Sequence, residues 1–327
     1  MLQFVLVNMN TTEQITERLK HENYYGDGHL INSPRSLNGQ AEPQCILARS
    51  FLEITPKFSV VVPVHNQENI IVRNLASILS NTAGTFEMII ICDACTDTSI
   101  DRIKRFVEAI PVGEDRTCKQ DQQLCAIIVI EQVTPIFETS CDNIGFTLAR
   151  GRFCLEIQAD MQMIQYGYNE QLAKGIYNYP EVFAVSGRCC HDLTQHQAIG
   201  KFDFLIEQRS DIRLEHLNGI FINQTCNRGP LLLDRERLKS IGYLDEQNYW
   251  LGDDDHDLMV RAALRGYLCG FVAIEFLSPM ADGSTKKARS AVDQTVYDAR
   301  KARSDGGRLL QMAKTLAPPR LCWRPFV

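Results

Sequence analysis

The stretch that decides the fold reads Phe58-Ser-Val-Val-Val-Pro-Val-His-Asn66. Its first seven residues are mostly apolar and β-branched, which favours a strand that is buried on both faces. The polar pair His65-Asn66 then ends the strand in a turn. Apolar residues recur at helical spacing between Asn69 and Ser80, directly after this turn. The segment therefore predicts the strand-then-helix unit of an open α/β sheet.

The same alternation continues along the chain. Strands are predicted at 86–92, 125–130, 153–157, 182–186, 230–233 and 268–274, and helices near 100–110, 143–149 and 254–265. Strands that are joined by helices lie parallel, with right-handed crossovers. We therefore expect an α/β protein with a Rossmann-like, mixed, mostly parallel sheet that is flanked by helices.

The two ends of the chain are patterned less regularly. Residues 1–55 are expected to form an irregular N-terminal arm with one helix near Thr12–His21. Residues 56–280 carry the alternating pattern and form the main domain. Residues 281–327 are expected to form a helical C-terminal tail, in which Gly306-Gly307 separates two helices.

Composition excludes several classes of protein. The 327 residues are 45% hydrophobic and 23% charged, as in ordinary soluble proteins. The net charge of −6 disfavours a nucleic-acid partner, because a duplex-binding surface needs a basic field. The longest apolar runs are too short to span a membrane. The 12 scattered cysteines fit reduced thiols better than a disulfide framework, so we expect a cytoplasmic protein with no transmembrane segment.

Three short acidic clusters follow apolar runs. They read Cys92-Asp-Ala-Cys-Thr-Asp97, Gln158-Ala-Asp-Met161 and Gly252-Asp-Asp-Asp-His-Asp257. Residues just beyond parallel strands line the edge of the sheet where ligands bind. Carboxylates at that edge can hold a divalent cation against phosphates or accept a proton from a hydroxyl. The pattern therefore favours an enzyme that acts on a nucleotide-activated substrate.

The order of the motifs resembles a family-2 glycosyltransferase of the GT-A fold over roughly residues 58–271. Residues 58–66 are similar to the family's opening strand and Pro-x-Tyr-Asn turn, and Gln158-Ala-Asp160 stands in the position of its Asp-x-Asp motif. The other matching segments are Leu75–Ser80, Glu87–Asp97, Asn143–Gly151, Gly242–Glu246 and Asp254–Tyr267. Together they follow the family's order of motifs.

The resemblance implies inverting transfer of a sugar from a nucleotide diphosphate, with UDP as the expected nucleotide, in carbohydrate biosynthesis. The expected acceptor is a hydroxyl of a glycan, a lipid-linked molecule or a protein. By position, Asp255 is the expected general base with Asp254 beside it, and Asp160 and Gln158 are the expected ligands of Mn²⁺ or Mg²⁺. The donor pocket is implied to contain Pro63, His65, Asn66, Asp93 and Asn143.

Chemistry supports these roles independently of the resemblance. A leaving diphosphate gains negative charge, and an electrophile close to it stabilises that charge. An attacking hydroxyl must lose a proton, which a carboxylate such as Asp255 can accept, and crowding by other acids is expected to raise the pKa of that carboxyl. Gln158 offers a hard cation only a neutral carbonyl, which predicts weaker metal binding than two acids would give.

Other interpretations compete. Acids at the start of a helix interact favourably with its dipole, but four acids in positions 253–257 exceed what capping needs. Cys92-x-x-Cys95 after a strand is typical of thiol oxidoreductases, and a set of Cys92, Cys95, Cys189, Cys190 and His191 would suit structural zinc. Trp250 fits a core aromatic as well as a ring that stacks on an acceptor. A nucleotide-sugar or glycan-binding protein that keeps the fold without catalysis is the remaining alternative.

Overall fold

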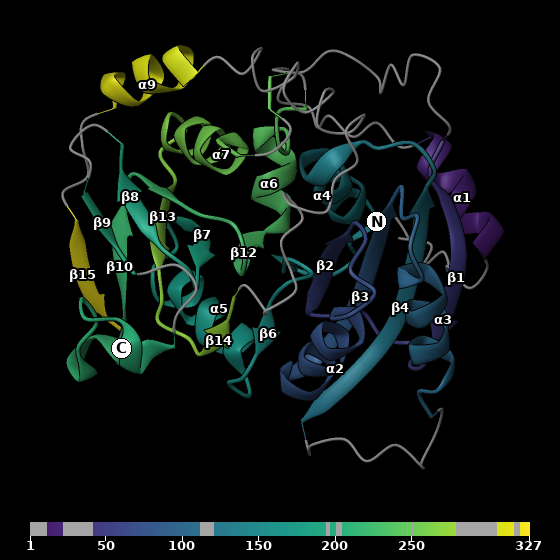
Figure 1. The fold of residues 1–327 in the computed structure, drawn as a ribbon. Helices are drawn as coiled ribbons and strands as arrows, with labels where there is room; N and C mark the ends of the chain where they lie inside the picture. The colour runs from purple at the N-terminus through teal and green to yellow at the C-terminus, as the bar shows by residue number, and fades with distance from the viewer. Residues whose placement is uncertain are drawn as a thin grey trace, which may run out of the picture.

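The computed structural model describes residues 12–21, 42–111, 121–193, 197–200, 205–246, 248–249, 252–278, 306–316 and 321–327. Its centre is a 10-stranded sheet in the order β1-β4-β3-β2-β5-β12-β7-β13-β10-β15 (Figure 1). In that order the strands are Gln44–Ser50, Gln122–Gln132, Gly84–Asp93, Phe58–Val64, Phe153–Glu156, Leu231–Asp234, Val182–Ser186, Leu268–Phe271, Gly219–Asn223 and Cys322–Pro325.

Most strands of this sheet share one direction. β4, β3, β2 and β5 are parallel neighbours, and β7 is parallel to β13. β12 lies antiparallel between β5 and β7, so β7 runs the same way as β5. β1 and β10 also run against their neighbours. The predicted α/β fold with a mixed, mostly parallel sheet flanked by helices is confirmed.

Helices cover both faces of the sheet. On one face the core side chains of β2 pack with those of α2, α3 and α5. On the other face Val61 and its neighbours pack with α1, α4, α6 and α7. The bounds are Thr12–His21 for α1, Ile71–Asn81 for α2, Ser99–Glu108 for α3, Phe137–Leu148 for α4, Tyr168–Asn178 for α5, Arg235–Ile241 for α6 and Asp254–Ala263 for α7. None of the helices in the described part of the chain is long and apolar enough to cross a membrane.

Helix α4 packs very closely on the sheet. A Cβ atom added at Gly145 would lie 2.2 Å from Cγ1 of Val61 in β2, so the glycine permits the close approach. Glu138 and Asp142 precede Gly145 by seven and three residues and therefore lie on the same stripe of the helix. The stripe that packs on β2 thus becomes acidic toward the N-terminus of α4.

Smaller elements complete the fold. A three-stranded sheet contains β11 (Thr225–Cys226), β8 (Cys190–Asp192) and β9 (Gln197–Ile199), and β14 (Phe276–Leu277) pairs with β6 (Gln162–Met163). Two short 3-10 helices span Ile206–Gln208 and Leu214–Asn218.

The ends of the chain differ in part from the expectation. The helix at Thr12–His21 is confirmed, but β1 from the expected irregular arm pairs antiparallel with β4. In the expected helical tail, β15 pairs with β10. Helix α9 (Gly306–Thr315) begins at the glycine pair, and the helix expected before that pair lies outside the described residues. Both edge strands depend on pairing with distant segments, which local patterns do not reveal. The proposed boundaries at residues 55 and 280 stay predictions.

Candidate active site

The expected site residues lie at the carboxyl ends of parallel strands, in the first turn of α7 and in the middle of α4. Pro63 is the penultimate residue of β2, and His65 and Asn66 follow that strand. Asp93 ends β3, and Gln158 and Asp160 come just after β5. Asp254 and Asp255 open α7, and Asn143 lies in α4.

The turns after β2 and β3 are joined by direct contacts. His65 Nδ1 donates to the carbonyl oxygen of Asp93 at 2.6 Å, which leaves Nε2 as the acceptor that faces the Asn66 amide at 3.3 Å. Asn66 has a left-handed backbone with φ of 50°, and its Oδ1 accepts from the backbone amide of Thr96 at 2.8 Å. The structure therefore brings His65, Asn66 and Asp93 together, as predicted for a shared pocket.

The Asp93 carboxylate fixes the start of α4. Its two oxygens accept from the backbone amides of Ile136 and Phe137 at 2.8 and 2.9 Å, and the side chain is buried. These amides precede and open the helix, where N–H groups have no partner within the helix. Asp93 thus ties the end of β3 to the acidic N-terminus of α4. Its expected contact with a nucleotide base stays a prediction.

The Gln158 side chain lies between the carboxylate of Glu138 and the guanidinium of Arg188. Its amide nitrogen donates to Glu138 Oε1 at 2.7 Å, and its amide oxygen accepts from Arg188 Nη1 at 2.8 Å. The oxygen that was expected to meet a metal therefore already holds a guanidinium. Asp160, two residues later, is half-buried at the same edge.

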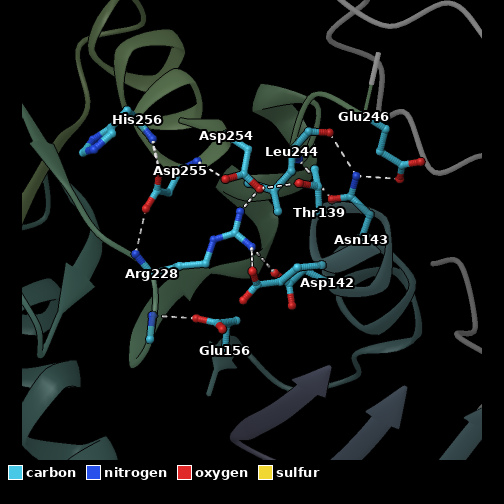
Figure 2. Close-up of polar contacts among 12 residues, drawn as sticks. Thr139, Asp142, Asn143, Glu156, Arg228, Leu244, Glu246, Asp254, Asp255 and His256 are labelled. Carbon is cyan, nitrogen blue, oxygen red and sulfur yellow. Dashed lines mark hydrogen bonds and ion pairs between the residues drawn. The ribbon is translucent and has the colours of Figure 1, made fainter. Parts of the chain in front are cut away.

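Arg228 is the centre of a buried polar network (Figure 2). Its guanidinium pairs with Asp142 at 3.1 Å and with Glu138 at 3.4 Å, and Nη2 pairs with Asp254 Oδ2. Asp254 also accepts from the hydroxyl of Thr139 at 2.7 Å. The network joins the first turn of α7 to the acidic stripe of α4, and nothing in the local sequence around Arg228 predicts it.

The Asp255 carboxylate is held by two backbone amides. Oδ2 accepts from the amide of Arg228 at 2.9 Å, and Oδ1 accepts from the amide of His256 at 2.8 Å. Burial favours the neutral acid, but the charges of His256 and Arg228 and these two hydrogen bonds together hold the pKa of Asp255 below its usual value. The expectation that crowding by acids raises this pKa is wrong, because the nearby cation and the amides outweigh the other carboxylates. Asp255 is therefore ionised at neutral pH.

Two neighbouring side chains have structural contacts. Asp257 pairs with Arg261 at 2.6 Å, one helical turn further along α7. Asn143 connects α4 to the loop before α7, because its amide donates to the Leu244 carbonyl at 2.9 Å and to Glu246 at 2.7 Å while its oxygen accepts from the Leu244 amide at 3.0 Å (Figure 2). Asn143 thus sets the position of the loop, and its expected role at the donor stays a prediction.

Three carboxylates that sequence analysis missed lie close together. One oxygen from each of Glu138, Asp142 and Glu156 falls within 4.8 Å of the others, a spacing that a metal ion could bridge. Burial and the neighbouring Glu138 raise the pKa of Glu156 to about 8, and burial and Glu156 raise the pKa of Asp142. Glu138 and Asp142 are four residues apart, which is the signal that could have indicated one acidic helix face.

The thiol alternatives receive no support from the described residues. Hydrogen bonding to Cys95 and burial raise the pKa of the Cys92 thiol well above its usual range, which disfavours a reactive thiolate. The group of potential metal ligands found in the described ranges contains carboxylates alone, without Cys189, Cys190 or His191. Trp250 lies outside the described residues.

Comparison with known proteins agrees with the motif order over part of the chain. Residues 59–129 match the model of glycosyl transferase family 2. No curated protein matches the sequence. The matched segment spans β2, α2, β3, α3 and most of β4.

Several solved structures are similar at low identity. They include TarS 1–349 of S. aureus in complex with UDP-GlcNAc (16% identity, 74% of this chain, 64% of that chain, TM-score 0.49). The mannosyltransferase PcManGT from Pyrobaculum calidifontis in complex with GDP-Man and Mn²⁺ gives 19% identity, 68% and 56% coverage, and a TM-score of 0.45. GalNAc-T7 with UDP, GalNAc and Mn²⁺ gives 14% identity, covers 71% of this chain and 46% of that chain, and has a TM-score of 0.49. This chain covers less than two thirds of each of these proteins.

Proposed function

We propose that this protein transfers a sugar from a nucleotide-diphosphate donor, with UDP as the expected nucleotide, to an acceptor hydroxyl with inversion. The observation that carries the proposal is the Asp255 carboxylate, which two backbone amides orient at the start of α7. It belongs to the polar network that reaches the carboxyl edge of β2, β3 and β5 through Arg228 and Glu138. The family-2 match of residues 59–129 supports the same reaction class.

Inversion requires one displacement, in which the acceptor oxygen attacks the anomeric carbon as the diphosphate leaves from the opposite side. Asp255 is the proposed general base for the acceptor hydroxyl. Because its pKa is held below the usual value, Asp255 is ionised across the neutral range and can accept a hydrogen bond from the hydroxyl at the outset. Asp254 is tied to Arg228 and Thr139, and so we give it a positioning role.

The donor is proposed to bind along the turns that follow β2 and β3. His65 and Asn66 form one side of this edge, and their mutual contacts with Asp93 and Thr96 hold both turns in place before any ligand arrives. Such preorganisation reduces the entropy cost of binding. Pro63 fixes the backbone φ angle at the penultimate residue of β2.

The residues at this edge fit a divalent cation in part. Asp160 offers a carboxylate for Mn²⁺ or Mg²⁺, whereas the amide oxygen of Gln158 is held by Arg188. When bound, such a cation would neutralise charge on the leaving diphosphate. Asp160 together with oxygens of the donor would hold it, and we therefore expect loose binding.

Donor cleavage tests the proposal. The purified protein would be incubated with a panel of UDP- and GDP-sugars, and free nucleotide would be measured with and without glycan acceptors. Nucleotide release that depends on acceptor, with an inverted anomeric product, is the expected result. Tight binding of a nucleotide sugar without release of free nucleotide under any condition would instead favour a nucleotide-sugar-binding protein without catalysis. The presence of Gln158 in place of an acid supports that alternative.

A further inference from the structure

Three acids face one another between helix α4 and the sheet. Glu156 ends β5 and pairs in register with Val61 of β2, so the two side chains point to the same face of the sheet. On that face Gly145 of α4 packs against Val61. Asp142 lies one helical turn before Gly145, and Glu138 lies one turn before Asp142. The acids of the helix and the acid of the strand accordingly meet, with one oxygen from each within 4.8 Å of the others.

Two oxygens of this cluster, Asp142 Oδ1 and Glu156 Oε1, have no hydrogen-bond partner among the described residues. Both residues are only 1% exposed. The second oxygen of each is held: Asp142 Oδ2 accepts from Arg228 at 3.1 Å, and Glu156 Oε2 accepts from the Gly229 amide at 2.6 Å (Figure 2). A buried carboxylate oxygen without a partner is costly, so these two oxygens favour a positively charged ligand that reaches both of them.

The charge around the cluster is strongly negative. Five carboxylates interact with the single guanidinium of Arg228, and they belong to Glu138, Asp142, Glu156, Asp254 and Asp255. Arg188 and, when protonated, His256 add at most two further positive charges. Three cations leave part of the charge of five acids uncompensated. Either protons or a bound cation can relieve it, and the raised pKa values of Asp142 and Glu156 reflect the same surplus.

The spacing and the chemistry of the cluster fit a hard divalent cation. Mg²⁺ binds oxygens at about 2.0–2.1 Å and Ca²⁺ at about 2.3–2.6 Å, so two ligands of one ion lie at most about 4–5 Å apart. The three oxygens meet this limit. Carboxylates without a thiolate or an imidazole favour Mg²⁺, Mn²⁺ or Ca²⁺ over zinc. The Glu138 side chain is 17% exposed, which gives an ion access from that side.

We propose that Glu138, Asp142 and Glu156 bind a divalent cation that ties helix α4 to the end of β5. The group does not contain Asp160, the acid to which we assign a cation held together with the donor. Its three ligands all come from the chain, so the cation binds without a nucleotide. Its role is structural, because it neutralises acids that surround Arg228 and holds α4 on the sheet. The inference goes beyond sugar transfer and does not depend on it.

Equilibrium dialysis of the full chain, stripped with EDTA and then exposed to Mn²⁺ without nucleotide, tests the site. The parent should bind one Mn²⁺ per chain, and Mn²⁺ should raise its melting temperature. Ca²⁺ and Mg²⁺ should compete for the same site. Glu156→Gln and Asp142→Asn keep the size of the side chain but remove a charged ligand, and each should weaken Mn²⁺ binding by at least about tenfold.

Two further variants show which acids hold the ion. Asp160→Asn should bind Mn²⁺ like the parent, because the proposed site does not include Asp160. Glu181→Gln is the matched control, since it removes a partly exposed acid that pairs with Arg324 at 2.6 Å. Mn²⁺ binding that is lost in Asp160→Asn but kept in Glu156→Gln and Asp142→Asn overturns the inference. Equal binding by all of the variants does so too, because it assigns the ion to adventitious surface acids.

Melting curves in EDTA separate a lost ligand from a lost fold. A variant that melts cooperatively in EDTA but gains no stability from Mn²⁺ has lost the site alone. Glu138→Gln keeps the test decisive if the two buried variants do not fold, because Glu138 is partly exposed and its loss should also weaken binding. A parent that binds no Mn²⁺, or binds it only with UDP present, overturns the inference. Neither result bears on the proposed function, which nucleotide release measures separately.

Discussion

The backbone amide of Arg228 donates a hydrogen bond of 2.9 Å to Oδ2 of Asp255. The guanidinium of the same residue pairs with Asp254, so one residue positions both acids, one by its main chain and the other by its side chain. Substitution of Arg228 removes the contact with Asp254 and leaves the amide in place. The two acids can therefore be tested separately.

Asp255→Asn should lower the rate of sugar transfer by at least about 10²-fold, the low end of what general-base catalysis supplies. Donor affinity should change by less than about twofold, because the proposed donor contacts lie on other turns. Initial rates and nucleotide titrations measure the two effects. Asp254→Asn and Asp257→Asn are the comparisons, and an active Asp255→Asn beside a folded but inactive Asp254→Asn would move the base to Asp254.

Arg228→Met should reduce the free energy of unfolding by about 3–5 kcal/mol, because it leaves the buried Asp142 and Asp254 and the half-buried Glu138 without their cation. Urea denaturation followed by circular dichroism gives the value. Arg213→Met, which removes an exposed pair with Glu215, should cost less than about 1 kcal/mol. Equal losses in the two variants would show that the buried network contributes no more than a surface pair.

The stability of the protein should depend on the protonation of Glu156. Its pKa is about 8 in the folded chain, against 4.5 for an unperturbed side chain, so the folded state holds a proton that the unfolded state has lost. The free energy of unfolding therefore decreases as the pH rises from about 5 to 8, with a slope of up to about 1.4 kcal/mol per pH unit from this group. Asp142, with its raised pKa, acts in the same direction.

Glu156→Gln removes this titration and is nearly isosteric. Its stability relative to the parent should therefore rise between pH 5 and pH 8, as measured by urea denaturation at each pH. A constant difference across that range would mean that Glu156 titrates at an ordinary pKa. Asp255 cannot produce the same trend, because its lowered pKa affects stability only as the pH falls into the acid range.

Asn143→Ala should cost about 1–3 kcal/mol of stability, because it removes both hydrogen bonds to the buried backbone of Leu244. Asn143→Asp keeps the acceptor but places a charge beside Glu246, and we expect a comparable loss that lessens as the pH is lowered. Thermal melting at pH 5 and 8 distinguishes the two variants. If both variants melt like the parent, the hydrogen bonds of Asn143 do not hold the loop in place.

Sequence patterns predicted the parts of the fold that local hydrophobicity determines. The run from Phe58 to Val64 is mostly apolar and is buried on both faces of β2, and it could be identified without any partner. Helix α4 was expected only from Asn143, but it begins at Phe137 because Asp93 accepts from the amides at its start. The edge strand β15 exists through pairing with β10, a contact that no local pattern carries.

Some residues of the candidate site could be located from the sequence, and others could not. Acids that follow strands, such as Asp93 and Asp160, could be located from their position in the sequence. Arg228 could not, because it meets Asp142 across 86 positions of the chain and its own neighbours form no recognisable motif. The expected sign of the pKa shift of Asp255 was wrong because, against the effect of burial, the charges of His256 and Arg228 and two backbone amides lower the pKa. His256 adjoins Asp255 in the sequence, but no pattern indicated Arg228.

The seating of α4 on β2 carries a consequence for mutational tolerance far from any reacting group. Gly145 touches Val61 with no room for a methyl group, yet its stripe also carries Glu138 and Asp142. A larger side chain at residue 145 would push α4 away from β2 and so move Glu138 and Asp142 away from Arg228. Selection on the chemistry at one end of α4 should therefore restrict the size of the residue at the other end, although that residue never meets a substrate.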